Sequence, residues 1–556
     1  MPSGSCSCTQ RARVMRRLVD ASILLLLATP LPVWASDAEW LYKIKPGDTL
    51  INIAAAYLTH PDDWPRLQTL NQVHNPKRLK PGSLLRLPVG LLKREAALAK
   101  VIYVQGKVSR TPKNGTQGIL PLDAPLQVGD IIETADDGSV SLRFVDGSRL
   151  LLTPGTRITL TKMVLFGKTG MAQTVIEMHR GSIETRVAKQ EQPAARYEIK
   201  SRPLNLAVRG TDFRVHISDA NQAAAGEVLE GEVEARGVRG KPVAVPGGFG
   251  TLAVAGEPTH APIALQAAPD LDRLLGQIER LPLHFALPIN PAGARYRAQV
   301  YADRTFEHLL LDGVFDHGQA KWADLPDGRY VLRVRARDQN GLEGMNADRE
   351  FVLNARPEPP FISAPLDGQK SYGSEALLRW TAALPEQTYH VQLSTKPDFQ
   401  EKLVDLTGLT KTEHALPLAP GQYFWRIAVV ASGQDQGPFS DVQGFIQRKI
   451  PESPKMEAPA IQDKYVVFRW AAGEPGSQYQ LQIAHDPEFS QPILDKVIDT
   501  EQIQIDRPEP GAYYLWIKTI DADGFAGPFG APQKLDIPAS KWWMLLLLLL
   551  PLPLAL

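Results

Sequence analysis

One aromatic spacing occurs three times in the second half of this chain, and it constrains the fold more than any other feature. In each copy a tyrosine is followed ten residues later by a phenylalanine, and 34 residues later by the tyrosine of a Gly-x-Tyr. A spacing that recurs in this way indicates a unit of structure repeated along the chain. The repeated positions are Tyr296, Phe306 and Tyr330, then Tyr389, Phe399 and Tyr423, then Tyr479, Phe489 and Tyr513.

Alternating apolar and polar residues predict that each copy is built from strands. Residues 389–393 and 479–483 alternate with a period of two, which is typical of a sheet with one buried face. Trp380 and Trp470 precede the first tyrosine by nine residues in the second and third copies, whereas the first copy has Phe285 at eleven. We expect these aromatic side chains to form a core rather than a platform for a sugar.

Modules with a tryptophan on an early strand resemble fibronectin type III or immunoglobulin-like β-sandwiches. The resemblance implies that each copy is a separate sandwich, and proline-rich joints at 356–360 and 450–459 fit that division. The expected limits of the three modules are residues 265–355, 356–450 and 451–538.

Residues 101–255 carry short alternating stretches separated by dense turn signals. Residues 139–144 alternate with a period of two, and Asp137-Gly138 and Asp146-Gly147 are dipeptides that favour reverse turns. The pattern predicts an all-β barrel or roll.

The order of motifs in this region resembles the FecR-type domain. The family includes the periplasmic parts of regulators that restrain or activate sigma factors across the inner membrane. Such regulators carry a cytoplasmic helical segment, whereas only the short basic stretch 1–17 precedes the first apolar run here. The resemblance therefore implies the domain but not the signalling role. Its motifs are VQGKVS (104–109), VGDIIETADDGSVSLRFVDGSRLLLTPGTRITL (128–160), RGSIETRV (180–187) and LAVRGTDFRVHI (206–217).

Two features of this region have both a chemical and a structural interpretation. The run from Arg209 to Asp212 is either a polar contact site or, as we favour, a tight turn or bulge that needs Gly210 for its backbone. His179 and His216 lie in strand-like runs, where solvated sheet residues are expected rather than catalytic bases.

Residues 42–88 predict a small unit of two strands and two helices. A strand-like run from Tyr42 reaches a turn, after which Thr49 or Asp48 can cap a helix whose apolar face begins at Leu50. A second helical stretch and a proline-rich turn precede the last strand, residues 84–87.

This βααβ order resembles the LysM domain, here expected over residues 36–90. The matches are Gly47-Asp48-Thr49-Leu50, Ile53-Ala54, Asn71, Asn75-Pro76, Pro81-Gly82 and Leu87-Pro88. The family binds N-acetylglucosamine-containing glycans, in bacteria mostly peptidoglycan, in a groove between the loop after the first strand and the loop before the second. Capping and turn formation are the alternative roles of the same residues. The candidate glycan-binding residues are Gly47, Asp48, Thr49, Leu50, Asn75, Pro76, Arg78 and Leu79.

Two connecting segments are predicted to be helical. Residues 91–100 are a linker, and GLLKREAALAK (90–100) has the composition of a short helix. Residues 270–280 place Leu271, Leu274 and Ile278 at helical spacing before the first repeat.

The N-terminus predicts export. Arginines within residues 11–17 precede an apolar run at 21–28, and Val33-Trp34-Ala35 fits cleavage after Ala35, so residues 1–35 are expected to be a signal peptide. Met15 makes a more usual start than Met1. The two cysteines, Cys6 and Cys8, would be lost on cleavage, leaving no thiol for a disulfide, a metal or catalysis.

The C-terminus predicts membrane contact. Lys541 and two tryptophans precede an apolar run, and residues 542–556 form too short a helix to span about 30 Å of hydrocarbon. We expect residues 541–556 to be a tail that dips into a membrane; the alternative is a segment packed on the third module.

Charge and motifs argue against several functions. Lys+Arg 61 balances Asp+Glu 61, so no basic field predicts nucleic-acid binding. No His-Glu-x-x-His, Gly-x-Ser-x-Gly or phosphate-binding loop predicts catalysis. Asp338-x-Asn340-Gly341 and Asp521-x-Asp523-Gly524 resemble the start of a calcium loop, but we favour hairpin turns and expect no metal or cofactor.

These features predict a mainly β, multidomain chain: a small α+β LysM unit, a FecR-type all-β domain and three β-sandwich modules. The expected protein is exported, non-enzymatic and located in the periplasm or cell envelope. It would bind peptidoglycan and present its β domains to an envelope protein that the sequence does not identify. The alternatives are a FecR-like signal-transduction component and a non-catalytic accessory to a cell-wall hydrolase.

Overall fold

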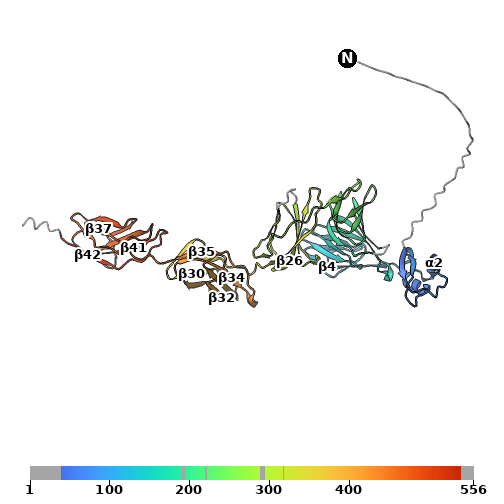
Figure 1. Ribbon diagram of the computed structural model, residues 1–556, viewed down its shortest axis with the longest axis horizontal. Helices are drawn as coiled ribbons and strands as arrows, with labels where there is room; N and C mark the ends of the chain where they lie inside the picture. The colour runs from blue at the N-terminus through green and yellow to red at the C-terminus, as the bar shows by residue number, and fades with distance from the viewer. Residues whose placement is uncertain (1–38, 191–194, 219–221, 289–294, 317, 540–556) are drawn as a thin grey trace, which may run out of the picture. The chain divides into compact units, whose positions relative to one another are not determined.

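The computed structural model describes residues 39–190, 195–218, 222–288, 295–316 and 318–539 (Figure 1). The predicted signal peptide, both cysteines and the apolar tail lie outside the described residues. The chain divides into two compact units, and the division passes through the first sandwich. The first unit comprises Met1–Asp272, Ala286–Ala320 and Val331–Arg349, and the second Arg273–Phe285, Lys321–Tyr330 and Glu350–Leu556.

The first unit begins with the predicted βααβ arrangement. Its two strands pair antiparallel, with Tyr42 opposite Leu85, and their apolar side chains face the helices. Leu50, Ile53 and Ala54 form the buried face of the first helix, as their spacing predicts. The elements are β1 (Glu39–Lys43), α1 (Leu50–Tyr57), η1 (Pro61–Asp63), α2 (Trp64–Leu70) and β2 (Leu84–Pro88).

A closed barrel follows, which confirms the predicted all-β barrel or roll. Its strand order is β10 through β20 and then β3 through β9. Strands from both ends of the region therefore belong to the same closed barrel. Most neighbours are antiparallel, and β12 pairs parallel with β13. The elements are η2 (Val89–Leu91), β3 (Glu95–Ala96), β4 (Ala99–Gln105), β5 (Val108–Thr111), β6 (Gly118–Ile119), β7 (Pro125–Leu126), β8 (Ile131–Thr134), β9 (Ser139–Arg143), β10 (Arg149–Leu152), β11 (Arg157–Leu165), η3 (Gly167–Thr169), β12 (Ala172–Arg186), β13 (Arg196–Lys200), β14 (Leu204–Val208), β15 (Asp212–Ile217), β16 (Ala223–Glu230), β17 (Glu232–Gly237), β18 (Val243–Pro246), β19 (Phe249–Val254) and β20 (Ile263–Ala264).

The helix predicted over residues 90–100 is wrong. After the single turn of η2, this stretch supplies β3 and the start of β4 to the barrel. Ala97, Ala99 and Val101 are all buried, so the alternation of a strand determines the structure here. Tertiary packing therefore overrides the local helix propensity of these residues.

The first sandwich module contributes strands to both units. Its larger sheet has the order β21-β27-β26-β23-β24, and its smaller sheet pairs β22 with β25. The elements are β21 (Gln277–Ile278), β22 (Leu283–Ala286), β23 (Arg295–Tyr301), β24 (Leu309–Phe315), β25 (Gln319–Trp322), β26 (Gly328–Arg337) and β27 (Ala347–Leu353).

The second and third modules are also two-sheet sandwiches. The second has sheets β28-β30-β33 and β29-β35-β34-β31-β32, and the third has β36-β37-β40 and β39-β38-β41-β42. The elements are β28 (Ile362–Ala364), β29 (Gln369–Tyr372), β30 (Glu375–Trp380), β31 (Thr388–Ser394), β32 (Val404–Leu409), β33 (Glu413–Pro417), β34 (Gly421–Val430), η4 (Ser432–Gln434), β35 (Gln443–Arg448), β36 (Ala460–Ile461), β37 (Tyr465–Arg469), β38 (Gln478–Ala484), β39 (Leu494–Ile498), β40 (Gln502–Asp506), β41 (Gly511–Ile520) and β42 (Gln533–Ile537).

The tryptophans and tyrosines of the second and third copies lie in the sandwich cores, which confirms that prediction for these residues, whereas Phe399 and Phe489 lie outside the core clusters. Trp380 and Trp470 are 4% and 3% exposed, and each packs edge-on against the first tyrosine of its module. In every copy the hydroxyl of the Gly-x-Tyr tyrosine donates a hydrogen bond to the backbone carbonyl four residues upstream. These bonds are Tyr330 to Pro326 at 2.8 Å, Tyr423 to Ala419 at 2.9 Å and Tyr513 to Glu509 at 2.9 Å.

The helix predicted over residues 270–280 is also wrong. Leu271 and Leu274 are buried, but the segment forms turns and then β21, which pairs parallel with β27 through Val352 and Leu353. Gly276 lies within the stretch and disfavours a helix. The pairing of β21 with β27 gives backbone N–H and C=O groups of this segment the hydrogen bonds that a helix would have made internally.

Two other structural interpretations are confirmed. Asp338 and Asp521 each begin a tight turn at the end of a strand; the Asp521 carboxylate accepts from the backbone N–H groups of Asp523 and Phe525 at 2.9 and 3.1 Å. Gly210 has φ +91°, and an added Cβ would lie 2.7 Å from Lys189 Cα. Gly210 is therefore required for its backbone, next to an irregularity in the β15–β16 ladder.

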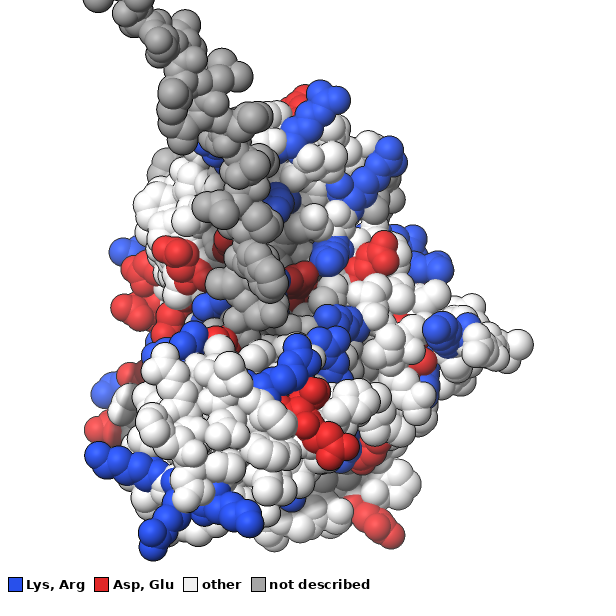
Figure 2. Space-filling view, turned by 90° about the vertical axis from the view of Figure 1, so that its right-hand side faces the viewer, with Lys and Arg blue, Asp and Glu red and all other residues white. Residues whose placement is uncertain are grey.

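Neither sign of charge dominates the face drawn in Figure 2, where basic and acidic side chains are interspersed. This distribution agrees with the equal numbers of basic and acidic residues in the sequence. Among the residues that the structure describes, none of the helices combines the length and apolar character needed to cross a membrane.

Candidate functional site

The loop after β1 is held in shape by Asp48 and Thr49. The Asp48 carboxylate accepts from the Tyr42 hydroxyl at 2.8 Å and from the Lys45 backbone N–H at 2.7 Å. Burial, and then the hydrogen bond to Asp48, raise the pKa of Tyr42, so this phenol remains a proton donor. Thr49 accepts from the backbone N–H of Asn52 at 3.1 Å and caps α1, as the sequence predicts.

The loop before β2 lies directly against the first loop. The backbone N–H of Leu50 donates to the carbonyl of Pro76 at 2.9 Å, which joins the two loops by their main chains. Asn75 shapes the second loop, because its side chain accepts from Lys77 N at 2.9 Å and its carbonyl from Arg78 N at 3.2 Å. The structure therefore brings together the two segments that the resemblance assigned to one groove.

The eight candidate residues differ in exposure. Gly47, Asn75 and Arg78 are exposed, whereas Asp48, Thr49, Pro76 and Leu79 are half-buried. Leu50 is 0% exposed and its side chain belongs to the apolar core, so that side chain is not available at the surface of the two loops. Leu50 acts on the loops through its backbone N–H, and Leu79 packs against the same core.

Asn71, which the sequence analysis gave only as a match to the LysM pattern, makes three side-chain hydrogen bonds. Its amide donates to the carbonyls of Leu67 and Arg86, both at 2.9 Å, and its oxygen accepts from Arg86 N at 2.7 Å. This side chain therefore connects α2 to β2, and fixes the strand that follows the second loop.

The apolar core of the βααβ unit includes two residues from the barrel. Phe166 and Met171 flank η3 between β11 and β12, are 2% and 0% exposed, and belong to the same apolar cluster as Leu58 and Leu92. Sequence reasoning missed this contact. The available signal was two large apolar side chains in a turn that also holds Gly167, where polar residues are the rule.

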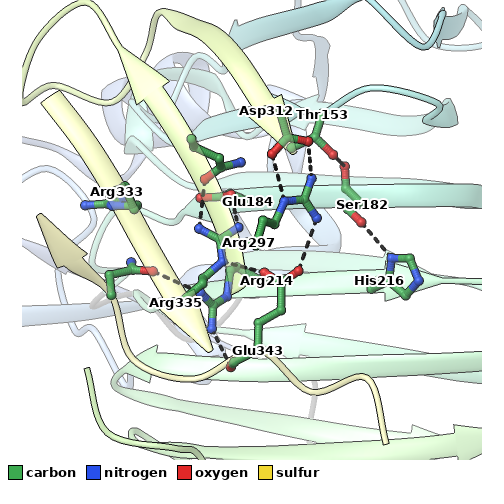
Figure 3. Close-up of polar contacts among 12 residues, drawn as sticks. Thr153, Ser182, Glu184, Arg214, His216, Arg297, Asp312, Arg333, Arg335 and Glu343 are labelled. Atoms are coloured by element: carbon green, nitrogen blue, oxygen red, sulfur yellow. Dashed lines mark hydrogen bonds and ion pairs between the residues drawn. The ribbon is translucent and has the colours of Figure 1, made fainter. Parts of the chain in front are cut away.

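A second polar arrangement joins the barrel to the first sandwich, within the first unit (Figure 3). Arg335 on β26 donates to Glu184 on β12 at 2.6 Å and also pairs with Glu343. Arg297 on β23 donates to Glu343 at 3.1 Å. Arg214 on β15 donates to the Glu343 carbonyl at 2.7 Å. We call this set, together with Glu227 and Asp312, the buried charge cluster.

Three glutamates of the buried charge cluster, Glu184, Glu227 and Glu343, have strongly shifted pKa values. Burial works against the charge of Glu184, but Arg335 and the other arginines nearby lower its pKa to about 2. Burial raises the pKa of Glu227 to about 7, because Arg214, 3.5 Å away, offsets the burial only in part and Glu343 adds repulsion. Arg335 and Arg297 hold the pKa of Glu343 well below its usual value despite its burial.

The geometry of the buried charge cluster is that of an interface. Its ion pairs connect two domains, and Ser139 on β9 adds a hydrogen bond to the Leu309 carbonyl of the sandwich at 3.0 Å. Two histidines on barrel strands form hydrogen bonds within the sheets: His179 with Thr159 at 2.8 Å, and His216 with Ser182 at 2.6 Å (Figure 3). In the described part of the chain, no group of three or more His, Cys, Asp or Glu side chains could hold a metal ion.

Two parts of the chain match family models. Residues 42–88 match the model described as LysM domain, and residues 130–234 match the model described as FecR protein. Domains of both kinds are typical of cell-envelope proteins. No curated protein sequence matches the chain.

Several solved structures resemble parts of the chain. The FN1–FN3 domains of chicken CNTN1 are 17% identical, with a TM-score of 0.23, over 45% of this chain and 90% of that one. Fibronectin(III)-like modules of Clostridium thermocellum CbhA are 14% identical, with a TM-score of 0.22, over 32% and 93%. A putative anti-sigma factor from Parabacteroides distasonis is 17% identical, with a TM-score of 0.20, over 24% and 60%. The chain therefore combines a segment that matches the LysM model, a segment that matches the FecR model and three two-sheet β-sandwiches.

Proposed function

We propose that this protein is an exported, non-enzymatic component of the cell envelope that binds peptidoglycan through its LysM domain. The observation that carries the proposal is the backbone bond from Leu50 to Pro76, which holds the two loops of the LysM groove side by side. Gly47, Asn75 and Arg78 remain exposed on these loops and can offer backbone and side-chain polar groups to a glycan. Peptidoglycan strands are rich in hydroxyl and amide groups, which such a surface can bind.

The β domains are proposed to serve protein interaction rather than catalysis. Glu184 and Glu227, two glutamates with strongly shifted pKa values, belong to an interface between two domains, where each is close to an arginine. The barrel histidines are bonded to sheet hydroxyl groups and not to a nucleophile in a cleft. Both observations support a scaffolding role.

Purified full-length protein should pellet with peptidoglycan sacculi. The intact chain is needed because Phe166 and Met171 complete the LysM core. Replacing Asn75 and Arg78 together by alanine should weaken pelleting at least about fivefold, through loss of exposed polar contacts worth roughly 1 kcal/mol.

The matched control is Arg66→Ala, which removes one exposed positive charge from α2 of the same domain. It should pellet like the wild type, and all three proteins should melt at the same temperature. Wild-type protein that stays in the supernatant while a known LysM protein pellets would contradict the proposal, as would equal pelleting of the double variant.

A signal-transduction role is the second candidate, and the FecR match over residues 130–234 favours it. In that case the barrel and the first sandwich would bind an envelope protein whose occupancy is reported across the membrane. Cross-linking in intact cells, followed by identification of the proteins bound to the barrel, separates the two roles. A membrane-embedded regulator among them supports signalling, and structural wall proteins alone support scaffolding.

Export and membrane contact of residues 542–556 are part of the same proposal. After digestion of peptidoglycan, the full chain should fractionate with membranes, whereas a chain ending at Ser540 should be released. The apolar run can bury enough surface for several kcal/mol of binding at about 25 cal/mol per Å². Equal recovery of both chains in the soluble fraction would overturn the membrane contact.

A further inference from the structure

The three sandwiches present the same positions on the outer face of their larger sheet. Counting from the first tyrosine of each copy, a glutamine lies three residues on and an aspartate 16 residues on. The phenylalanine ten residues on has φ +56°, +53° and +56° in the three copies. The residues that the three copies share are Gln299, Phe306 and Asp312, then Gln392, Phe399 and Asp405, then Gln482, Phe489 and Asp495.

In the first sandwich this face is covered by the barrel. Gln299 and Arg335 are 0% and 1% exposed, and Arg335 donates to Glu184 of the barrel at 2.6 Å. Tyr301 and Leu309 form an apolar cluster with Leu151 of the barrel. In this copy the face therefore binds another β-sheet of the same chain. Arg335 of β26 contacts the carboxylate of Glu184 on β12 of the barrel.

In the second sandwich the same face is largely filled by its own residues. Arg426 lies 4.3 Å from the ring centroids of both Phe399 and Phe439 and donates to Gln392 at 2.9 Å. Gln392 is 3% exposed beneath these groups.

In the third sandwich the face is open. An aromatic stack crosses it: Trp516 lies 3.9 Å from Phe489 and 4.5 Å from Phe529, with interplanar angles of 2° and 13°. Trp516 and Phe529 are half-buried, and the neighbouring Val497 on β39 is 53% exposed.

Opposite charges lie on the two strands that flank β38. Lys518 on β41 occupies the position of Arg335 in the first copy, and its ammonium lies 4.5 Å from the Phe529 ring centroid. Asp495 lies on β39, two strands away in the order β39-β38-β41-β42, where the amides of Gln480 and Gln482 donate to it at 2.7 and 2.8 Å. A surface with a cation on one side and a carboxylate on the other is complementary to itself under a two-fold rotation.

We propose that this face of the third sandwich binds the same face of a second copy of the chain. In the pair, Lys518 of each copy meets Asp495 of the other, and the aromatic stack on β41 and Val497 on β39 supply the apolar contacts. The arrangement reuses the sheet-on-sheet contact seen between the first sandwich and the barrel, with lysine in the place of Arg335 and aspartate in the place of Glu184.

Sedimentation velocity of the full chain tests the proposal, in mild detergent that suppresses association through the apolar C-terminal residues. The wild type should dimerise at concentrations up to about 100 µM, the range of weak specific association. Lys518→Glu and Asp495→Lys should each raise the dissociation constant at least about tenfold, because like charges then face one another. The double variant should restore dimerisation, since the pairs are re-formed with exchanged signs.

Lys464→Glu is the control, a charge reversal at an exposed lysine in the turn between β36 and β37 of the other sheet, and it should dimerise like the wild type. Melting temperatures of all variants establish that the module is folded. A wild type that remains monomeric, a dimer indifferent to both reversals, or a double variant that stays monomeric although folded would each overturn the proposal.

Discussion

Replacing Trp425 by alanine will lower the free energy of unfolding of the second sandwich by about 3–5 kcal/mol. Trp425 is 0% exposed, packs against Trp380 with ring centroids 6.3 Å apart, and donates from its indole N–H to the Pro365 carbonyl at 3.0 Å. The substitution leaves a cavity the size of an indole and a buried carbonyl without its donor. Both effects act in the same direction.

Hydrogen exchange followed by mass spectrometry locates the effect within the full chain, through the peptides that cover β30, β31 and β34. Phe424→Ala is the matched control, since Phe424 neighbours Trp425 on the same strand but is half-buried on the opposite face. It should cost about 1–2 kcal/mol, in keeping with partial burial. Equal opening free energies for the two variants would show that the indole is not central to the core.

Replacing Glu343 by glutamine will separate the first sandwich from the barrel at a cost of about 3–5 kcal/mol. Glu343 pairs with both Arg297 and Arg335, whose side chains are 8% and 1% exposed. The substitution leaves these two guanidinium groups buried with less compensating charge. The exposed pair of Glu234 and Arg236, with both side chains more than half exposed, provides the control: Glu234→Gln should change stability by less than about 0.5 kcal/mol.

The same cluster predicts a pH dependence, and Glu227→Gln isolates it. The pKa of Glu227 is about 7 in the folded protein and near 4.5 ordinarily, so the folded state holds a proton that the unfolded state has released between these values. Its contribution is complete below about pH 4.5 and is lost as the pH rises through 7, a difference on the order of 3 kcal/mol. Glu184, with a pKa of about 2, acts in the opposite sense and loses its contribution as the pH falls below 4.5.

Urea unfolding of the full chain at several pH values measures both parts. Stability of the barrel and first sandwich should be highest near pH 4.5, should fall between about pH 4.5 and 7 and should level off above pH 7, and this fall should be absent from Glu227→Gln. Glu343→Gln should be unstable throughout this range. A wild-type protein that gains stability from pH 6 to 8, or a Glu227→Gln variant with an unchanged decline, would contradict the assignment of the bound proton.

Local patterns predicted much of this fold. The cap at Thr49, the turns at Asp338 and Asp521 and the core positions of Trp380 and Trp470 each depend on residues close in sequence or on a spacing repeated between copies. In such cases the physical cause lies within a few residues, and a single sequence contains it. The helix predictions for residues 90–100 and 270–280 were wrong because these segments pair as strands with distant parts of the chain, which outweighs their helix-favouring composition.

The contacts between domains could not be predicted in this way. Glu184 and Arg335 are 151 positions apart, and each alone looks like an ordinary charged residue of an alternating strand. Comparison of the repeats offered one signal, because β26 carries Arg335 where the second copy has Ala428 and the third Lys518. The candidate site was predicted better than these contacts, since its two loops lie within 30 residues of one another, although Leu50 contributes its backbone and not its side chain.

The position of Phe166 and Met171 in the LysM core limits where domains of such a chain can be recombined during evolution. A gene fusion or deletion that cuts after residue 90 would expose apolar surface on both fragments, because the barrel turn fills part of the smaller domain. Recombination is therefore tolerated poorly at this junction. The LysM and FecR-type segments should be gained or lost together, as one heritable block, whereas the proline-rich joints around the later sandwiches leave each core intact when cut.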